Sequence, residues 1–393
     1  MAPSRIARVS TTSELDPLDY ALDADLRARL LSPSLVIFLD HVRANLRTVI
    51  AQLDGDPGRW RPHIKTLKIP EIFRELLQAG VRHFKCATTR EARKLAELIA
   101  AEGTTGCEIL LAHPIQGPGV QQLAVIADEH SSIRMAVLVE CPLAARAMPQ
   151  VLGQFVDLNL GMDRTGIPLA AHESILEVAA AAGERLVGLH AYDGHRYEPD
   201  MGQREELLKD SYSKLAGVVQ AVRTAGYPVH EVITAGTPAF LPASRASALR
   251  DLPDLVHRVS PGTVVFHDVR SSQQNPELDL LPAAVLFTRV VSHPTPGRIT
   301  CDAGSKSLAA EAGDPCAVVI GHPQLLALRP SEEHLPLAYE TGEPLPRGTE
   351  LLLVPRHVCP TVNLAEQALI IESGQAPRIV DVSARAHDLL YDH

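Results

Sequence analysis

The pattern that decides the fold is clearest in residues 83–112, whose sequence is HFKCATTREARKLAELIAAEGTTGCEILLA. A short run, His83–Ala87, is followed by Thr89–Ala101, in which apolar residues recur at helical spacing, and then by a second short run, Glu108–Ala112. Alternation of strand, helix and strand over this length is typical of a βαβ unit. This stretch therefore predicts an α/β protein with a parallel sheet.

The same alternation extends along the chain in both directions. Eight short runs are separated by longer segments with helical spacing, and the runs are Leu35–Leu39, His63–Lys65, His83–Ala87, Glu108–Ala112, Met135–Val139, Val156–Leu160, Leu186–Ala191 and Glu231–Ala235. Eight strands of this kind favour a closed (β/α)8 TIM barrel. An open, doubly wound sheet is the alternative, but no GxGxxG motif follows the first run.

The pattern changes after about residue 266. Residues 270–300 are rich in Pro, Ser and Gln, and short apolar stretches separated by Gly and Pro follow them. This texture predicts a small antiparallel β domain. We therefore expect three parts: an N-terminal arm, 1–31, able to pack on the β domain; a barrel, 32–266; and a C-terminal antiparallel β domain, 267–393.

Composition limits the classes of partner. The chain has 393 residues, with 37 Lys and Arg against 47 Asp and Glu, and only 4% aromatic residues. A net charge of −10 argues against nucleic acid or an anionic membrane as the main partner. The six cysteines form no CxxC pair, no apolar run is long enough to span a membrane, and the N-terminus lacks the apolar core of a signal peptide. We expect a cytoplasmic protein with a small-molecule substrate.

Four segments that follow predicted strands hold many Lys, Arg, His, Tyr and Gly residues, namely 61–68, 159–166, 190–197 and 234–238. In a parallel barrel such segments meet at the carboxyl ends of the strands, where active sites form. Gly236 and Thr237 would offer backbone N–H groups and a hydroxyl to a phosphate. A nearby lysine can form a Schiff base with a phosphorylated aldehyde. Each feature also has a structural explanation, such as a turn at Gly236, a core role for His190 or an ion pair for Arg164.

A second cluster lies in the predicted β domain, where His357 and Cys359 are two residues apart. On an extended strand, residues i and i+2 point to the same face. An imidazole and a thiolate on one face can bind a Zn²⁺ ion and leave positions open for water or substrate. The alternative is a chance His-x-Cys pair.

These segments together resemble the D-threonine aldolase/D-serine dehydratase family, which has the alanine-racemase-like fold (fold type III) and uses pyridoxal 5'-phosphate. The resemblance covers almost the whole chain. It is carried by residues 61–66 (RPHIKT), 84–88 (FKCAT), 111–115 (LAHPI), 161–166, 194–195, 236–238 (GTP), 261–263 (PGT), 302–306, 331–334 and 357–361 (HVCPT).

The resemblance implies a role for each matching residue. Lys65 would form the Schiff base with pyridoxal phosphate, Gly236 and Thr237 would hold its phosphate, and Arg164 would lie beside its ring. The segments that contain His63, His190 and Tyr192 place these three residues at the cofactor too. His357 and Cys359 would bind a divalent metal, zinc or manganese. His195 or Tyr192 is the candidate base.

Two positions bear on the substrate. The family usually has His where this chain has Leu67, which puts the substrate range in question. Cys359 is typical of dehydratases in the family, whereas some aldolases have Asp at this position. The overall likeness nevertheless favours a D-threonine aldolase type of reaction, which splits a D-3-hydroxy amino acid into glycine and an aldehyde.

Several alternatives to this function remain open. One is β-elimination, as in a D-serine or 3-hydroxyaspartate dehydratase, which gives a 2-oxo acid and ammonia. Another is an amino-acid racemase or epimerase, although the Lys-Ala-Asn-Ala-Tyr segment of the racemases is absent. A third is a pyridoxal phosphate-binding protein without turnover. The resemblance also implies a homodimer.

Overall fold

The computed structural model describes residues 15–391. The described residues divide into two compact units. The barrel unit comprises 46–264 and 383–391, and the β unit comprises 15–45 and 265–382. The predicted arm, 1–31, lies outside the described residues as far as residue 14. None of the described helices is long and apolar enough to cross a membrane.

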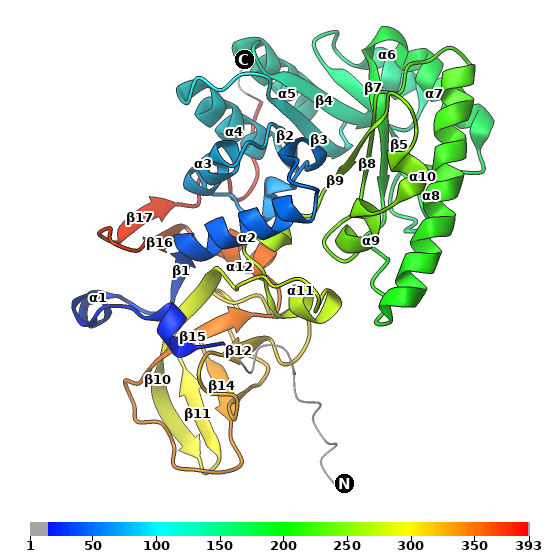
Figure 1. Cartoon of the computed structure of the whole chain (residues 1–393). Coiled ribbons are helices and arrows are strands. Elements are labelled where there is room, and N and C mark those ends of the chain that lie inside the picture. The colour runs from blue at the N-terminus through cyan, green and yellow to red at the C-terminus, as the bar shows by residue number, and fades with distance from the viewer. Residues whose placement is uncertain (1–14, 392–393) are drawn as a thin grey trace. The chain divides into compact units, whose positions relative to one another are not determined.

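The barrel unit contains a parallel sheet with the order β2-β3-β4-β5-β7-β8-β9, with a short strand β6 beside the end of β5 (Figure 1). The strands are β2 (His83–Cys86), β3 (Glu108–Pro114), β4 (Arg134–Val139), β5 (Gly153–Asn159), β6 (Ile167–Pro168), β7 (Leu186–Tyr192), β8 (Glu231–Thr234) and β9 (Val256–Val259). Residues 60–63 complete the circle, because Trp60 pairs in parallel with Val259 and His63 with Lys85. The barrel prediction is confirmed. The extended segment 60–63 takes the place of the first barrel strand.

The predicted barrel strands need three corrections. The run His63–Lys65 is not a strand, because only His63 pairs with a neighbour and Ile64–Thr66 form a 3₁₀ helix. The run Leu35–Leu39 was assigned to the barrel, but β1 (Ser34–Phe38) pairs with β10 and β16 in the sheet of the β unit. This strand is buried and paired on both sides, so its apolar sequence resembles that of a barrel strand. The eighth barrel strand is instead β9, whose sequence VHRV places polar His257 and Arg258 inside the protein and shows no apolar run.

Helices alternate with the strands of the barrel unit, as the sequence predicts (Figure 1). They are α3 (Pro70–Gln78), α4 (Thr89–Ala101), α5 (Pro118–Glu129), α6 (Pro142–Ala147), α7 (His172–Ala182), α8 (Met201–Thr224), α9 (Phe240–Ser244) and α10 (Ser247–Arg250). The start of α4 shows why the chain turns where it does. The Thr88 hydroxyl accepts the N–H of Glu91, and the Glu91 carboxylate accepts the N–H of Ala87 and pairs with buried Lys68. This cap fixes the carboxyl end of β2.

The interior of the barrel is built in layers. At the amino ends of the strands, Arg61 donates to Glu231 (2.8 Å) and to Glu108 (2.7 Å), and Arg258 pairs with Glu231. We call Arg61, Glu108, Glu231 and Arg258 the ionic layer. Above it lies an apolar layer of Leu110, Ala136, Leu138, Phe155 and Ile233. Such stacked layers make a TIM barrel a packed core rather than a pore.

The β unit has a nine-stranded sheet with the order β13-β14-β11-β10-β1-β16-β17, in which β15 pairs with β10 and β12. All pairs are antiparallel except β1 with β16. Besides β1, the strands are β10 (Ala284–Thr295), β11 (Arg298–Cys301), β12 (Ala317–Val319), β13 (Leu326–Ala327), β14 (Leu335–Ala338), β15 (Glu350–Pro355), β16 (Gln367–Ile371) and β17 (Arg378–Asp381). The predicted antiparallel β domain is confirmed.

Short helices accompany this sheet, namely α1 (Ala24–Arg29), α11 (Val269–Gln274) and α12 (Val358–Leu364). The segment that includes α1 is not loose, because Tyr20 and Leu26 are buried in a cluster with Val36, Phe287 and neighbouring residues. One helix, α2 (Leu39–Ala51), begins in the residues of the β unit and ends in those of the barrel unit.

Candidate active site

A third, polar layer lies at the carboxyl ends of the barrel strands. It consists of Lys85 on β2, Asp157 on β5 and His190 on β7, which we call the upper polar layer. The Lys85 Nζ lies 2.9 Å from His190 Nε2, and His190 Nδ1 lies 2.7 Å from Asp157 Oδ1. Since β2 and β7 are not neighbours in the sheet, the contact between Lys85 and His190 crosses the barrel interior.

The protonation of this layer follows from its contacts. Hydrogen bonds from His190 and Thr165 lower the pKa of Asp157 against the opposing effect of burial, so this carboxylate is charged. Burial and then Lys85 lower the pKa of His190 to about 4, so this imidazole is neutral near pH 7. A neutral His190 therefore donates from Nδ1 to Asp157 and accepts at Nε2 from Lys85.

Lys65 comes soon after the extended segment 60–63, which takes the place of the first barrel strand. It sits in a short 3₁₀ helix, Ile64–Thr66, and the His63 side chain accepts the Lys65 backbone N–H at 3.5 Å. The Lys65 side chain is exposed, whereas Ile64, Thr66 and Leu67 are buried. Burial, followed by the positive charges of Lys65 and Lys85, lowers the pKa of His63 well below its usual value. The sequence thus places an accessible amine at the rim beside the upper polar layer.

Tyr192 lies at the centre of the predicted cofactor residues. The Arg164 guanidinium lies 4.7 Å from the Tyr192 ring centroid, and the Lys85 Nζ lies 5.6 Å from it. A Cβ added at Gly194 would come within 2.3 Å of the Tyr192 ring, and one at Gly236 within 3.0 Å. The two glycines are therefore needed for this position of the ring. The structure brings Lys65, His63, Arg164, His190, Tyr192 and Gly236 to one end of one barrel.

The Gly236–Thr237 turn follows β8, close to a buried acid. Asp193 Oδ1 accepts the Gly236 N–H at 3.3 Å, and Asp193 Oδ2 accepts the Tyr212 hydroxyl. Burial raises the pKa of Asp193 to about 6 in spite of these hydrogen bonds. Asp193 therefore orders the turn that the sequence assigns to phosphate binding.

His195, the candidate base, lies half-buried beside Gly161. Both ring nitrogens are buried and have no hydrogen-bond partner of normal geometry among residues 15–391, although the Leu160 backbone acts on the ring. Burial and then Arg196 lower the pKa of His195, so the ring is neutral near pH 7. A neutral imidazole with a vacant nitrogen suits proton transfer.

Sequence reasoning missed three residues of this end of the barrel, namely Lys85, Asp157 and Asp193. Lys85 stands in an apolar run, where a buried lysine is rare, and that rarity was the available signal. Asp157 and His190 are direct partners in the pairing of β5 with β7, and this register could not be read from the sequence.

The predicted metal pair lies in the β unit, but the local structure differs from the prediction. His357 and Cys359 are not on a strand: His357 is the N-cap of α12, and Cys359 lies in its first turn. Pro360 ends the strand pattern, since it lacks an N–H and is accommodated in the first turn of a helix. The two side chains nevertheless interact with one another. The His357 Nδ1 also lies 2.9 Å from Glu311 Oε1.

Among residues 15–391, no group of three or more His, Cys, Asp or Glu side chains is arranged to hold a metal ion. Burial would lower the pKa of His357, but contacts with Cys359, Asp268 and Glu311 outweigh it and raise the pKa to about 9. With this pKa the His357 ring is protonated near pH 7, so a metal ion would have to displace that proton before His357 could bind it beside Cys359.

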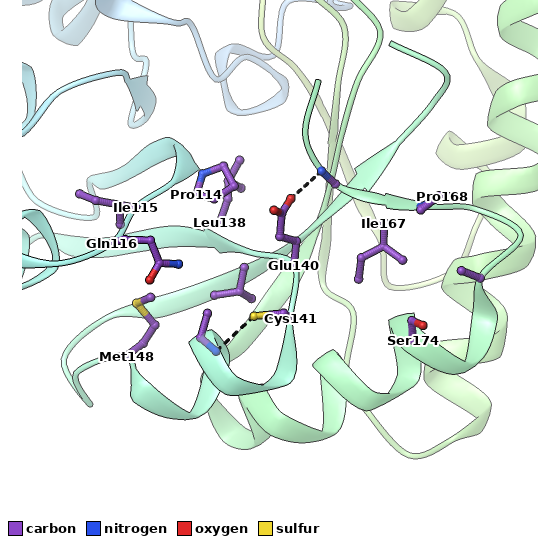
Figure 2. A pocket seen from close by; sticks show the side chains of 14 residues that line it. Pro114, Ile115, Gln116, Leu138, Glu140, Cys141, Met148, Ile167, Pro168 and Ser174 are labelled. Atoms are coloured by element: carbon purple, nitrogen blue, oxygen red, sulfur yellow. Dashed lines mark hydrogen bonds between the residues drawn. The ribbon is translucent and has the colours of Figure 1, made fainter. Parts of the chain in front are cut away.

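A separate cavity of about 390 Å³ opens beyond β3, β4 and β6 (Figure 2). Its wall includes Glu140, whose Oε2 accepts the Gly166 N–H at 2.6 Å, and Cys141, whose thiol caps the start of α6 (Figure 2). None of the predicted site residues lines it. The Glu140 contact anchors the segment that carries Arg164, and this links the cavity wall to the candidate site.

Comparison with known proteins agrees with this arrangement. The family model "Alanine racemase, N-terminal domain" matches residues 37–268, and the model "Putative serine dehydratase domain" matches residues 283–371. The first match covers more than half of the chain, so the chain belongs to the alanine racemase N-terminal domain family. The D-threonine aldolase of Arthrobacter sp is 28% identical over 381 residues, which are 93% of this chain and 95% of that protein.

Two further relatives show the range of the group. The D-threo-3-hydroxyaspartate dehydratase of Delftia sp. (strain HT23) is 27% identical over 368 residues, which are 86% of this chain and 93% of that protein. The crystal structure of D-threonine aldolase from Filomicrobium marinum has a TM-score of 0.79 and 25% identity, and the match covers 91% of this chain and 96% of that one. A structure of D-threo-3-hydroxyaspartate dehydratase with one cysteine replaced by alanine, described as the metal-free form, has a TM-score of 0.76 and 21% identity, and the match covers 92% of this chain and 99% of that one.

These findings confirm the resemblance to the D-threonine aldolase/D-serine dehydratase family and the prediction of an enzyme of the lyase class. The relatives include both aldolases and dehydratases, so the comparisons define the class of reaction and leave the specific reaction to be argued from the site.

Proposed function

We propose that this protein is a lyase of D-3-hydroxy amino acids that depends on pyridoxal phosphate and a divalent metal, and that it cleaves its substrate to glycine and an aldehyde. The observation that carries the proposal is the accessible Lys65 amine at the rim of the barrel, close to buried Lys85, which contacts the hydrogen-bonded pair His190 and Asp157. The match to D-threonine aldolases over more than nine-tenths of the chain supports the aldol reaction.

The residues at the carboxyl end of the barrel fit pyridoxal phosphate. Lys65 would bind the cofactor covalently, Gly236 and Thr237 would hold its phosphate, and Arg164, Tyr192, His63 and His190 would surround its ring. The two glycines that leave room for Tyr192 support this assignment, because larger residues would displace the ring. When bound, pyridoxal phosphate supplies an electron sink for negative charge that develops at Cα.

The protein's own groups would then select the bond that breaks. His195 is neutral near pH 7, and a neutral imidazole has one nitrogen that can accept a proton, so it is suited to take the proton of the 3-hydroxyl. Loss of that proton favours cleavage between Cα and Cβ. Tyr192 is the second candidate, since its ring lies against Gly236 at the same end of the barrel.

His357 and Cys359 would hold the divalent metal. An imidazole and a thiolate are donors that suit zinc better than manganese. A metal of this kind acts as a Lewis acid on a hydroxyl group. A related dehydratase structure is described as being in a metal-free form, and this wording supports a metal in the group.

A specific observation favours a second candidate, β-elimination to a 2-oxo acid and ammonia. The serine dehydratase domain model matches residues 283–371, which include His357 and Cys359. In that reaction the Cα proton is removed first, and the 3-hydroxyl leaves as hydroxide. Lys65, once displaced by the substrate, would be the base for that proton.

One incubation separates the candidates. The purified protein is mixed with pyridoxal phosphate, a divalent metal and D-threonine, and the products are identified. Glycine with acetaldehyde supports the proposal, whereas 2-oxobutanoate with ammonia supports β-elimination and overturns it. L-allo-Threonine would indicate epimerisation. If none of these forms although the cofactor is bound, the substrate class is wrong for D-threonine, and D-3-hydroxyaspartate and D-serine are the next substrates.

We also propose a cytoplasmic homodimer, as the resemblance implies. All six cysteines are free in the structure, which supports a reducing compartment. Light scattering coupled to size-exclusion chromatography tests the dimer, and a single species at the monomer mass of 42.5 kDa would contradict it.

A further inference from the structure

A carboxylate lies beside His357, one of the two residues proposed to hold the metal. The His357 Nδ1 is 2.9 Å from Glu311 Oε1. A carboxylate accepts hydrogen bonds, so Nδ1 carries a hydrogen and donates it to Glu311. The Nε2 atom is then the ring nitrogen that can bind a metal ion.

Glu311 belongs to a loop, residues 309–315, whose place is set by the sheet of the β unit. Strand β12 follows this loop, and strand β15 precedes His357. The two strands are antiparallel neighbours, with Ala317 at the start of β12 opposite Pro355 at the end of β15. The loop and the metal pair therefore lie at the same end of these two strands.

Hydrogen bonds also tie this loop to the residues on both sides of His357. Before it in the chain, Arg356 Nε donates to the Ala312 carbonyl at 3.1 Å. After it, the Thr361 hydroxyl accepts the Ala309 N–H at 3.2 Å and donates to the His357 carbonyl at 2.9 Å. The backbone that carries Glu311 is thus fixed to the backbone that carries the metal pair.

A second, buried acid is used differently. Asp268 is 1% exposed, its Oδ2 accepts the Val358 N–H at 2.9 Å, and its Oδ1 accepts the Ser271 N–H at 2.7 Å. Both Asp268 oxygens therefore hold backbone, whereas Glu311 contacts the imidazole ring. Since residues 15–391 contain no group of three side chains arranged to hold a metal, Glu311 is placed to orient a ligand rather than to be one.

We propose that Glu311 is a positioning residue for His357: it accepts the Nδ1–H and so presents Nε2 to a divalent metal beside Cys359. The inference rests on the part of the proposed function that assigns a metal to His357 and Cys359. A hydrogen bond to one ring nitrogen fixes the tautomer and the orientation of a histidine ligand, and it makes the other nitrogen a stronger donor. Loss of such a partner costs about 10- to 100-fold in metal affinity.

A merely structural Glu311 would behave differently. If its carboxylate only held the loop, its removal would lower the thermal midpoint of the metal-free protein and leave metal affinity unchanged. The Glu311 side chain is 56% exposed, so a positioning role predicts the reverse pattern, with a weakened metal site and a midpoint within a degree or two of wild type.

The test measures the zinc affinity of the full-length protein by calorimetry against a competing chelator. Wild type, Glu311→Ala and Glu311→Gln are compared, with exposed Glu343→Ala in the same unit as the matched control. For Glu311→Ala we expect zinc binding to be about 10- to 100-fold weaker. Glu311→Gln should lose less, because its amide oxygen still accepts from Nδ1, and Glu343→Ala should match wild type.

A second readout identifies the nitrogen that binds the metal. Nitrogen NMR spectra are recorded for zinc-loaded protein labelled with ¹⁵N-histidine, and the signals of His357 are those lost in His357→Gln. We expect a protonated Nδ1 and a zinc-bound Nε2. Binding of zinc through Nδ1 would overturn the proposal, and so would equal zinc affinities in wild type and folded Glu311→Ala.

These outcomes are separable from failure of the proposed function. His357→Ala and Cys359→Ala are measured alongside, and if both bind zinc as tightly as wild type, the metal assignment is wrong and this inference falls with it. If both lose tight binding while Glu311→Ala keeps it, the metal assignment stands and the inference alone is overturned. No amino-acid substrate is used, so the choice between aldol cleavage and β-elimination affects none of these measurements.

Discussion

Both ends of the barrel bury charged side chains, but the partners of these charges differ between the two ends. In the ionic layer, Arg61 meets Glu108 and Glu231, and Arg258 meets Glu231, so each charge has an opposite partner at hydrogen-bond distance. In the upper polar layer, the Lys85 amine faces a neutral imidazole instead. Paired charges at the amino ends indicate a structural role, and an unbalanced charge at the carboxyl ends indicates chemistry.

The pKa shifts follow the same division. Burial would raise the pKa of Glu108, but the charge and hydrogen bond of Arg61, together with Arg134, outweigh it and lower that pKa, so the carboxylate stays charged. At the other end, the pKa of Lys85 falls to about 7 and that of Asp193 rises to about 6, both chiefly through burial. Two described groups whose shifted pKa comes close to neutral, Lys85 and Asp193, therefore lie at the carboxyl ends of the strands, where the loops of a barrel form active sites.

The largest expected effect lies at the carboxyl end, with Lys65→Ala. Removal of the amine should abolish attachment of pyridoxal phosphate and lower turnover by at least about 10³-fold. The thermal midpoint should remain within a degree or two of wild type, since the Lys65 side chain is exposed. Activity and melting temperature are measured on the same preparation, and retention of activity would refute the cofactor assignment.

The converse effect is expected at the amino end, with Arg61→Met. This change leaves two buried glutamates without their main partner and should cost on the order of 3–5 kcal/mol of unfolding free energy. Urea unfolding measures the loss. Arg74→Met, which breaks one half-exposed pair with Glu102, is the matched control and should cost less than about 1 kcal/mol. Similar losses in the two variants would show that the ionic layer is not structural.

The sequence predicted the barrel and the β unit, and it picked out the segments that the structure brings to one end of the barrel, because each rests on local pattern or on short motifs. It could not assign Leu35–Leu39 to the right sheet, since a strand buried on both faces has the same composition in either sheet. The sequence did not reveal β9, because this strand carries Arg258 of the ionic layer and therefore shows no apolar run. It also missed Lys85 and Asp157, whose roles depend on contacts between strands far apart in the chain.

Gly188 on β7 and Gly194 in the loop after β7 test whether a position serves the fold or the candidate site. A Cβ at Gly188 would lie 2.0 Å from the Glu231 carbonyl oxygen of the neighbouring strand, whereas one at Gly194 would meet only the Tyr192 side chain. Because backbone cannot move aside cheaply, Gly188→Ala should destabilise the fold by roughly 2–4 kcal/mol. Gly194→Ala should instead displace Tyr192 and weaken cofactor or substrate binding about tenfold with little loss of stability. Unfolding curves and cofactor titrations on both variants check this, and the reverse assignment would contradict it.

The smallest expected effect concerns His83 and His190, two histidines at opposite ends of the barrel that are neutral near pH 7 because their pKa values are lowered. Burial and Arg258 lower the pKa of His83 to about 3, and burial and Lys85 lower that of His190 to about 4. Each folded-state pKa lies below the unfolded value near 6.5, so each histidine contributes stability that is present above pH 6.5 and is lost as the pH falls toward 4.

The His83 ring nitrogen lies 3.0 Å from Arg258 Nη2, and glutamine preserves an acceptor that does not titrate. His83→Gln should therefore reduce the stability lost between pH 7 and pH 5 by on the order of 1–2 kcal/mol. Exposed His172→Gln serves as the control, and comparison with wild type at each pH cancels the opposite contribution of Asp193. An unchanged pH dependence in His83→Gln would mean that the amino end of the barrel admits water and a proton to His83, and the contrast between the two ends would then rest on the ion pairs alone.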